Sequence, residues 1–153
     1  MNDFDDEEDR LWRSLMRLNG ALPRLLDEDL VRGAGLSLSE FAILLVLSEA
    51  GASGQRMSVL AHAGRLSPSR ATRVVAELER RGLVEKSRSE SDARGNVAVV
   101  TAAGRKVFRS AYPIQVKRAR EILFDHLTPT EVAALSDALS LLLGRVGAAE
   151  RLN

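Results

Sequence analysis

The chain has 153 residues, of which 45% are hydrophobic and 28% charged, so it is long enough and apolar enough to fold as one domain. The absence of cysteine excludes disulfides, thiolate zinc sites and thiol redox chemistry. Only 4% of the residues are aromatic, which favours packed helices over an all-β sandwich. Residues 3–9 are acidic where a secretory signal needs positive charge, and no apolar stretch approaches the length of a membrane span. We therefore expect a cytoplasmic protein with no membrane role.

Charge is distributed unevenly along the chain. The net charge is only +1, but residues 65–106 contain ten basic and five acidic side chains, a local excess of five positive charges. Most such runs are simply a solvated surface, so charge alone identifies no partner. It indicates nucleic acid only where a DNA-binding motif coincides with it.

The N-terminal third predicts two helices. Leucines recur at three- and four-residue steps from Leu11 to Leu30, which is the stripe of a long amphipathic helix that Pro23 is expected to bend. Glycines at 33 and 35 end this helix. Ser37 and Glu40 then have the spacing of a capping box for a helix reaching about residue 50. That second helix is apolar nearly all round and should be the most buried element.

The basic region predicts two short helices followed by a hairpin. The first helix spans about residues 57–64, and the second begins at Ser67, with Pro68 at its first position, and ends at Gly82. Residues 83–87 and 97–101 are prone to form strands and flank a polar tip. The second helix has its apolar residues on one side: Ala71, Val74, Val75 and Leu78. These elements predict a winged helix-turn-helix.

The C-terminal third predicts two more helices. Thr101 can cap the first, which should kink or restart at Pro113. Thr128 and Glu131 form a capping box for the second, with Pro129 at its first position. The predicted fold class is therefore mainly α with a small β-hairpin wing and long helices at both ends of the chain.

The second short helix is the candidate DNA reader, because a helix fits the major groove and arginine can bind guanine or phosphate there. Arg94, beside Gly95 near the hairpin tip, is a candidate for a narrow minor groove. Glu77, with Arg80 or Arg81, is interpreted as a surface ion pair and is not included among the readers. The predicted DNA-binding residues are Ser67, Ser69, Arg70, Thr72, Arg73, Arg88, Asp92 and Arg94.

Residues 67–84, the segment Asp92-Ala93-Arg94-Gly95 and residues 99–104 resemble the signature of the MarR (multiple antibiotic resistance regulator) family. The start of the last helix at 127–131 also fits, so the resemblance covers the chain from about Glu8, although the acidic residues 3–9 lie outside the pattern. It implies a single MarR-type domain with dimerisation helices at about 8–34 and 104–150 around a winged helix-turn-helix at about 36–103. Asp92 and Arg94 match the family's wing motif.

The resemblance also implies a function. It predicts a homodimeric, sequence-specific transcription regulator that binds a palindromic duplex. The regulator is a repressor or an activator, and a repressor released by a small aromatic or carboxylate effector is the preferred interpretation. The ligand pocket of the family lies between the dimer region and the DNA-binding lobe. Trp12 is a candidate lining residue, with packing in the dimer as the more ordinary interpretation. No cofactor is implied.

Other functions fit the sequence less well. A metal sensor would have to use His62 and His126, which are far apart in sequence and lack cysteine partners. The common catalytic motifs are absent, so an enzyme is not expected. The protein could be a monomer whose terminal helices pack only on the core of the same chain. A dimer is favoured, because seven leucines on the first helix exceed what one small domain can cover. A winged protein that binds only proteins would instead expose an apolar second helix.

Overall fold

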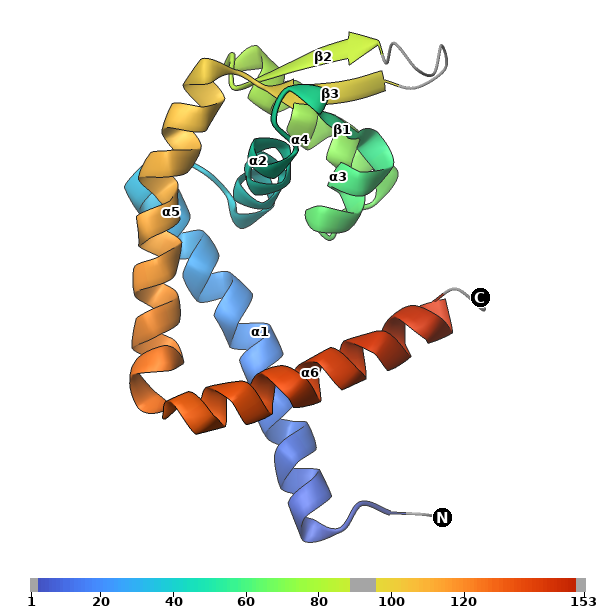
Figure 1. The fold of residues 1–153 in the computed structure, drawn as a ribbon, viewed down its shortest axis with the longest axis vertical. Helices are drawn as coiled ribbons and strands as arrows, with labels where there is room; N and C mark the ends of the chain where they lie inside the picture. Colours follow the sequence, from blue (N-terminus) through green and yellow to red (C-terminus); the bar gives the residue numbers. More distant parts are fainter. Residues whose placement is uncertain (1–2, 89–95, 151–153) are drawn as a thin grey trace. The chain divides into compact units, whose positions relative to one another are not determined.

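The computed structural model describes residues 3–88 and 96–150. It divides into two compact units, Met1–Gln115 and Val116–Asn153. The first unit holds α1 to α4, a small sheet and the first part of α5, and the second holds the end of α5 and α6 (Figure 1). The predicted mainly helical fold with a small antiparallel sheet is confirmed.

Helix α1 spans Asp6–Ala34 and begins at a capping box that the sequence did not suggest. Asp5 accepts hydrogen bonds from the backbone of residues 7 and 8, and Glu8 reaches back to the Asp5 N–H. The helix runs through Pro23 without interruption and ends at Gly35, whose φ of 62° is left-handed. It extends away from α2–α4, so its N-terminal end lies far from them (Figure 1).

Helices α2 (Leu38–Ala50), α3 (Met57–Ala63) and α4 (Pro68–Arg80) form the centre of the first unit. The predicted Ser37–Glu40 capping box is present at the start of α2. Helix α2 is the most buried helix, as its sequence predicts, because it contributes four core side chains. The fully buried core of the unit is built largely from Leu30, Leu36, Phe41, Ile43, Leu44, Leu47, Leu60, Val75, Leu78, Val84 and Val100.

A three-stranded antiparallel sheet lies beside these helices, in the order β1-β3-β2. Strands β2 (Val84–Arg88) and β3 (Asn96–Val100) are the predicted hairpin, each within a residue of its expected bounds. Strand β1 (Gln55–Arg56) was missed. It consists of two residues between the 3-10 turn Gly51–Ser53 and α3, too few to show any alternation, and it forms only by pairing with β3.

Helix α5 spans Ala102–Ile122 and begins where Thr101 accepts a hydrogen bond from the Gly104 N–H, as predicted. The helix continues through Pro113, so the expected alternative of a restart there was wrong. A proline removes one hydrogen bond, and a helix of 21 residues keeps its ladder on both sides. After a 3-10 turn at Phe124–His126, α6 (Pro129–Glu150) begins at the predicted Thr128–Glu131 capping box.

Among the described residues, no single helix is long and apolar enough to cross a membrane. Only the segments Asp6–Ala34 and Leu38–Ser53 together, bent by 77° at their junction, meet the criterion of length and composition.

Gly104 is required by close packing where α5 leaves the sheet. A Cβ at this position would overlap the Leu83 carbonyl and lie 2.8 Å from the Val100 side chain. We expect Gly104→Ala to lower the free energy of unfolding by about 1–3 kcal/mol, because the backbone must shift. Denaturant unfolding checks this, with the exposed Ala103→Ser as control within about 0.5 kcal/mol of the unsubstituted chain. Equal stability of the two variants would contradict it.

Candidate nucleic-acid interface

Helix α4 is buried on one side and exposed on the other. Ala71, Val75 and Leu78 are fully buried in the core. The helix begins at Ser67, whose hydroxyl accepts from the Arg70 N–H, and Pro68 occupies the first turn, where its missing N–H leaves no partner unsatisfied. These local features set where the helix starts, and the apolar spacing sets which side faces solvent.

Five of the eight predicted DNA-binding residues lie at the start and on the exposed side of α4. They are Ser67, Ser69, Arg70, Thr72 and Arg73. The Thr72 hydroxyl donates to the Pro68 carbonyl at 3.0 Å, so it offers a ligand acceptor lone pairs and a methyl group. The Ser67 and Ser69 hydroxyls lie 3.3 Å apart. The structure therefore brings these five residues together on one polar, cationic surface.

The positive charge of this surface is concentrated in the first half of α4. Arg70 and Arg73 form no ion pair within the described part of the chain. Further along, Arg80 makes a two-point contact with Glu77, at 2.6 and 2.8 Å. Arginines 70 and 73 therefore remain as the open cationic groups of α4.

Strand β2 is joined to α4 by an ion pair. Lys86 Nζ lies 2.8 Å from Glu79 Oε2. This hydrogen bond holds the pKa of the Glu79 carboxyl below its ordinary value, and the Arg80 contact does the same for the pKa of Glu77. Both carboxylates are thus committed to partners, which limits their repulsion of a polyanion.

The wing is described in part. Arg88 ends β2 opposite Asn96 of β3, so its backbone lies at the base of the predicted tip. Asp92 and Arg94 lie outside the described residues. Their roles, like those of the residues on α4, remain predictions from the sequence.

An apolar cleft of about 620 Å³ opens between α1 and the helix-turn-helix. Two arginines, Arg65 and Arg70, are the charged groups in its lining. Arg65 lies in the turn between α3 and α4 with a φ of 52°, a conformation that non-glycine residues seldom adopt. The apolar lining is supplied by Leu15, Leu18, Leu22, Pro23, Leu26, Leu38, Ala42, Ala63 and Leu66.

Trp12 does not line this cleft. Its side chain is half exposed, and the centre of its ring lies 6.2 Å from the centre of the Phe4 ring near the start of α1. Within residues 3–88 and 96–150, no group of three or more His, Asp or Glu side chains is arranged to hold a metal ion. His126 instead lies 2.9 Å from the Glu121 carbonyl, at the end of α5.

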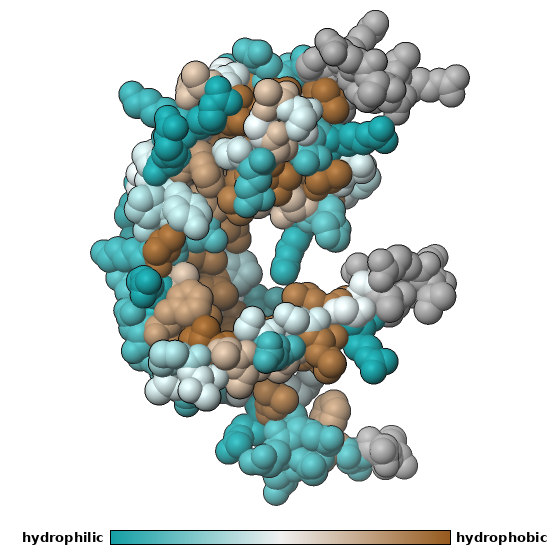
Figure 2. All heavy atoms as spheres, viewed as in Figure 1, coloured by the Kyte–Doolittle hydropathy of each residue, from teal (hydrophilic) through white to brown (hydrophobic). Residues whose placement is uncertain are grey.

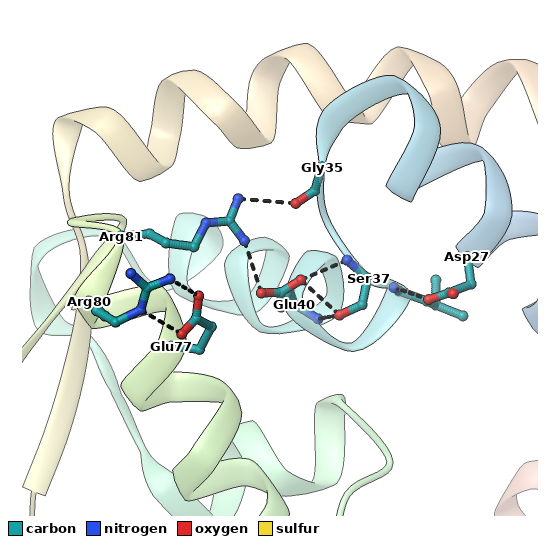
Figure 3. A network of polar contacts seen from close by, with 8 residues as sticks. Asp27, Gly35, Ser37, Glu40, Glu77, Arg80 and Arg81 are labelled. Atoms are coloured by element: carbon teal, nitrogen blue, oxygen red, sulfur yellow. Dashed lines mark hydrogen bonds and ion pairs between the residues drawn. The ribbon is translucent and has the colours of Figure 1, made fainter.

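Sequence reasoning missed the contact between α4 and the start of α2. Arg81 does not pair with Glu77; it reaches Glu40 and the Gly35 carbonyl, whereas the predicted surface pair forms with Arg80 (Figure 3). The partners of Arg81 are more than 40 residues away in sequence, so helical spacing gives no signal for them. The only signal was that Glu40 occupies a capping position.

The fold and this surface together define a winged helix-turn-helix protein of the DNA-binding class. A model of the MarR family matches residues 34–95. The Sco3205 protein of Streptomyces coelicolor, a MarR family transcriptional regulator solved in complex with DNA, is 31% identical with a TM-score of 0.85, over 94% of this chain and 89% of that one. The chain belongs to the MarR family of transcriptional regulators.

Two further proteins are similar to this chain. The uncharacterized HTH-type transcriptional regulator YfiV of Bacillus subtilis is 31% identical over 110 residues, 70% of this chain. The matched region spans 65% of the length of YfiV. CouR of Rhodococcus jostii RHA1, solved bound to p-coumaroyl-CoA, is 28% identical with a TM-score of 0.74, over 88% of this chain and 92% of that one.

The ion pair between Lys86 and Glu79 should be visible in the titration of Glu79. Its folded pKa is lowered, so the pair contributes stability above the pKa of the unfolded chain and loses it as pH falls through the folded value. We expect Lys86→Gln to return the Glu79 pKa to its ordinary range, measured by NMR of the side-chain carboxyl. Lys106→Gln, an exposed control, should leave it unchanged. An unaltered Glu79 titration in Lys86→Gln would exclude the pair in solution.

Proposed function

We propose that this protein is a homodimeric, sequence-specific DNA-binding regulator, not an enzyme, which represses transcription until a small-molecule effector releases it. The observation that carries the proposal is the exposed surface of α4. There, two arginines without ion-pair partners in the described part of the chain share one side of the helix with three hydroxyl side chains. Arginine fits guanine edges and phosphates, and hydroxyls can contact either. Arg94, in the wing, is proposed to reach the adjacent minor groove.

A dimer is supported by apolar side chains that the described chain leaves exposed at both ends. Leu11, Trp12, Met16 and Leu18 are exposed in the first half of α1. Helix α6, by itself, exposes Leu135, Leu139, Leu141, Leu142, Leu143 and Val146, and apolar side chains are visible along it in Figure 2. Large exposed apolar surfaces mark association sites. A two-fold dimer would present two α4 helices to a palindromic duplex.

We expect Arg70→Ala and Arg73→Ala each to weaken binding to the operator. Fluorescence anisotropy with a duplex from the gene's own upstream region checks this at several salt concentrations. The slope of log affinity against log salt is negative, and each lost phosphate contact reduces its magnitude by about 0.9. Each lost guanine contact costs about 1–3 kcal/mol of binding free energy.

Arg80→Ala is the matched control, because Arg80 belongs to the same helix and is already paired with Glu77. Its affinity should fall much less than that of Arg70→Ala or Arg73→Ala, because the only change is the added repulsion of the freed Glu77 carboxylate. Two chains per duplex are expected at saturation. Equal binding of the operator and a scrambled duplex by all variants would overturn the assignment of α4 as the reader.

The effector is proposed to occupy the apolar cleft between α1 and the helix-turn-helix. The cleft combines an apolar lining with Arg65 and Arg70, which suits a small molecule with an apolar body and an anionic group. CouR, with a bound acyl-CoA, supports effector binding by a relative of this fold. A small aromatic carboxylate has both of the required parts.

Filling the cleft should prevent release by such a molecule. We expect millimolar benzoate, used as the probe, to displace the duplex from the unsubstituted chain. Ala42→Met, which places a flexible apolar side chain in the lining, should reduce that displacement severalfold while leaving operator affinity in place. Ala103→Met, at an exposed position of α5, is the control. Equal displacement in both variants would place the effector outside this cleft.

A further inference from the structure

Arg81 joins α4 to two other helices. Its Nη1 donates to Glu40 Oε1 at 3.0 Å, and its Nη2 donates to the Gly35 carbonyl at 3.1 Å (Figure 3). The side chains of Arg81 and Glu40 are only 29% and 13% exposed, so the pair is largely removed from water. One guanidinium, at the residue that caps the end of α4, therefore contacts the residue that caps the end of α1 and the first turn of α2.

The acceptors of Arg81 are themselves held in place. Glu40 Oε2 accepts from the Ser37 N–H at 2.7 Å and the Ser37 hydroxyl at 2.9 Å, so the capping box fixes the carboxylate that faces Arg81. The Leu38 N–H donates to Asp27 Oδ1 at 2.7 Å, which ties the start of α2 to α1. Arg81 thus binds to a preformed junction of two helices (Figure 3).

The neighbouring ion pairs have a different character. Arg80 pairs with Glu77 on its own helix, three residues away, and its side chain is 73% exposed. Lys86 joins Glu79 to the sheet through a single amine. Among the described ion pairs of α4, that of Arg81 is the one that reaches both α1 and α2.

A helix that reads DNA needs this kind of attachment. The contacts of Ala71, Val75 and Leu78 bury area but are not directional. Arg70 and Arg73 lie 11 and 8 residues before Arg81, which is about 12–16 Å along the helix axis. A tilt of α4 about its buried face would move these arginines relative to a base edge, and hydrogen bonds tolerate little displacement.

We infer that Arg81 is a positioning residue for DNA recognition: with Glu40 and the Gly35 carbonyl it fixes the angle of α4, and it makes no contact with DNA itself. The inference rests on the proposed function of α4 as the reading helix. It assigns to Arg81 a role that differs from those of Arg70 and Arg73, although all three are arginines of one helix segment.

The test measures operator affinity and its salt dependence for Arg81→Gln, Glu40→Gln and the double variant, with Arg80→Gln as the matched control. Glutamine at 40 can retain the capping box with Ser37 and removes only the charge that faces Arg81. We expect each single variant to lose about tenfold in operator affinity. The double variant should bind no more weakly than the weaker-binding single variant, because the two residues act as one unit. Arg80→Gln should stay within about twofold.

The salt slope separates positioning from contact. Substitution of a positioning residue leaves the salt slope unchanged, whereas loss of a phosphate contact reduces the magnitude of the slope by about 0.9. A lowered slope in Arg81→Gln would overturn the inference, and so would unchanged affinity in both single variants. All measurements are made at a temperature where unfolding curves show each variant folded, so a purely stabilising role would lower the melting temperature without moving affinity.

If Arg81→Gln fails to fold, Glu40→Gln and Arg81→Lys carry the test. Lysine presents one point donor where arginine presents two, so it should recover only part of the lost affinity. Full recovery by lysine would overturn the two-point attachment. Failure of the unsubstituted chain to bind its operator would instead overturn the proposed function, and with it this inference.

Discussion

The burial of Ala71, Val75 and Leu78 is the contact on which the rest of the first unit depends. These three side chains lie on one side of α4, and each is fully buried in the core. Because residues three and four apart share a helix face, the same spacing leaves Ser69, Arg70, Thr72 and Arg73 in solvent. Burial of the apolar side is thus what presents the polar side to solvent.

Electrostatics refine this arrangement. The excess of positive charge in residues 65–106 is not spread evenly over the surface, because the second half of α4 neutralises much of its own charge. Glu77 pairs with Arg80, and Glu79 with Lys86. Such exposed pairs contribute little to stability. Their consequence is spatial, since they confine the open cationic groups of α4 to its first half, where a helix can approach base edges most closely. The acidic start of α1 lies at the end of α1 that is remote from α4. Hydrophilic side chains gather there (Figure 2).

The features predictable from the sequence were those encoded by neighbours. Ser67 with Pro68, Ser37 with Glu40, and Thr128 with Glu131 each set a helix start through contacts within four residues, and all three were located correctly. Strand β1 was missed because two residues carry no periodicity and acquire their structure from β3. The Arg81 contact was missed for the same reason, since its partners are distant in sequence. The shared exposure of Ser69, Arg70, Thr72 and Arg73 on one side of α4 was predictable from the apolar spacing, but which arginines stay unpaired depends on tertiary contacts.

Arg70 connects the two activities that we propose. Its side chain lies on the exposed surface of α4 and also lines the cleft that α1 forms with the helix-turn-helix. One edge of a guanidinium, with its two parallel N–H donors, can bind one carboxylate or one phosphate at a time. An anionic effector that pairs with Arg70 in the cleft therefore removes a donor from the DNA surface directly, without requiring a separate signal through the fold. Arg73, which does not line the cleft, has no such conflict, and so the two arginines serve DNA binding alike but differ in their exposure to the effector.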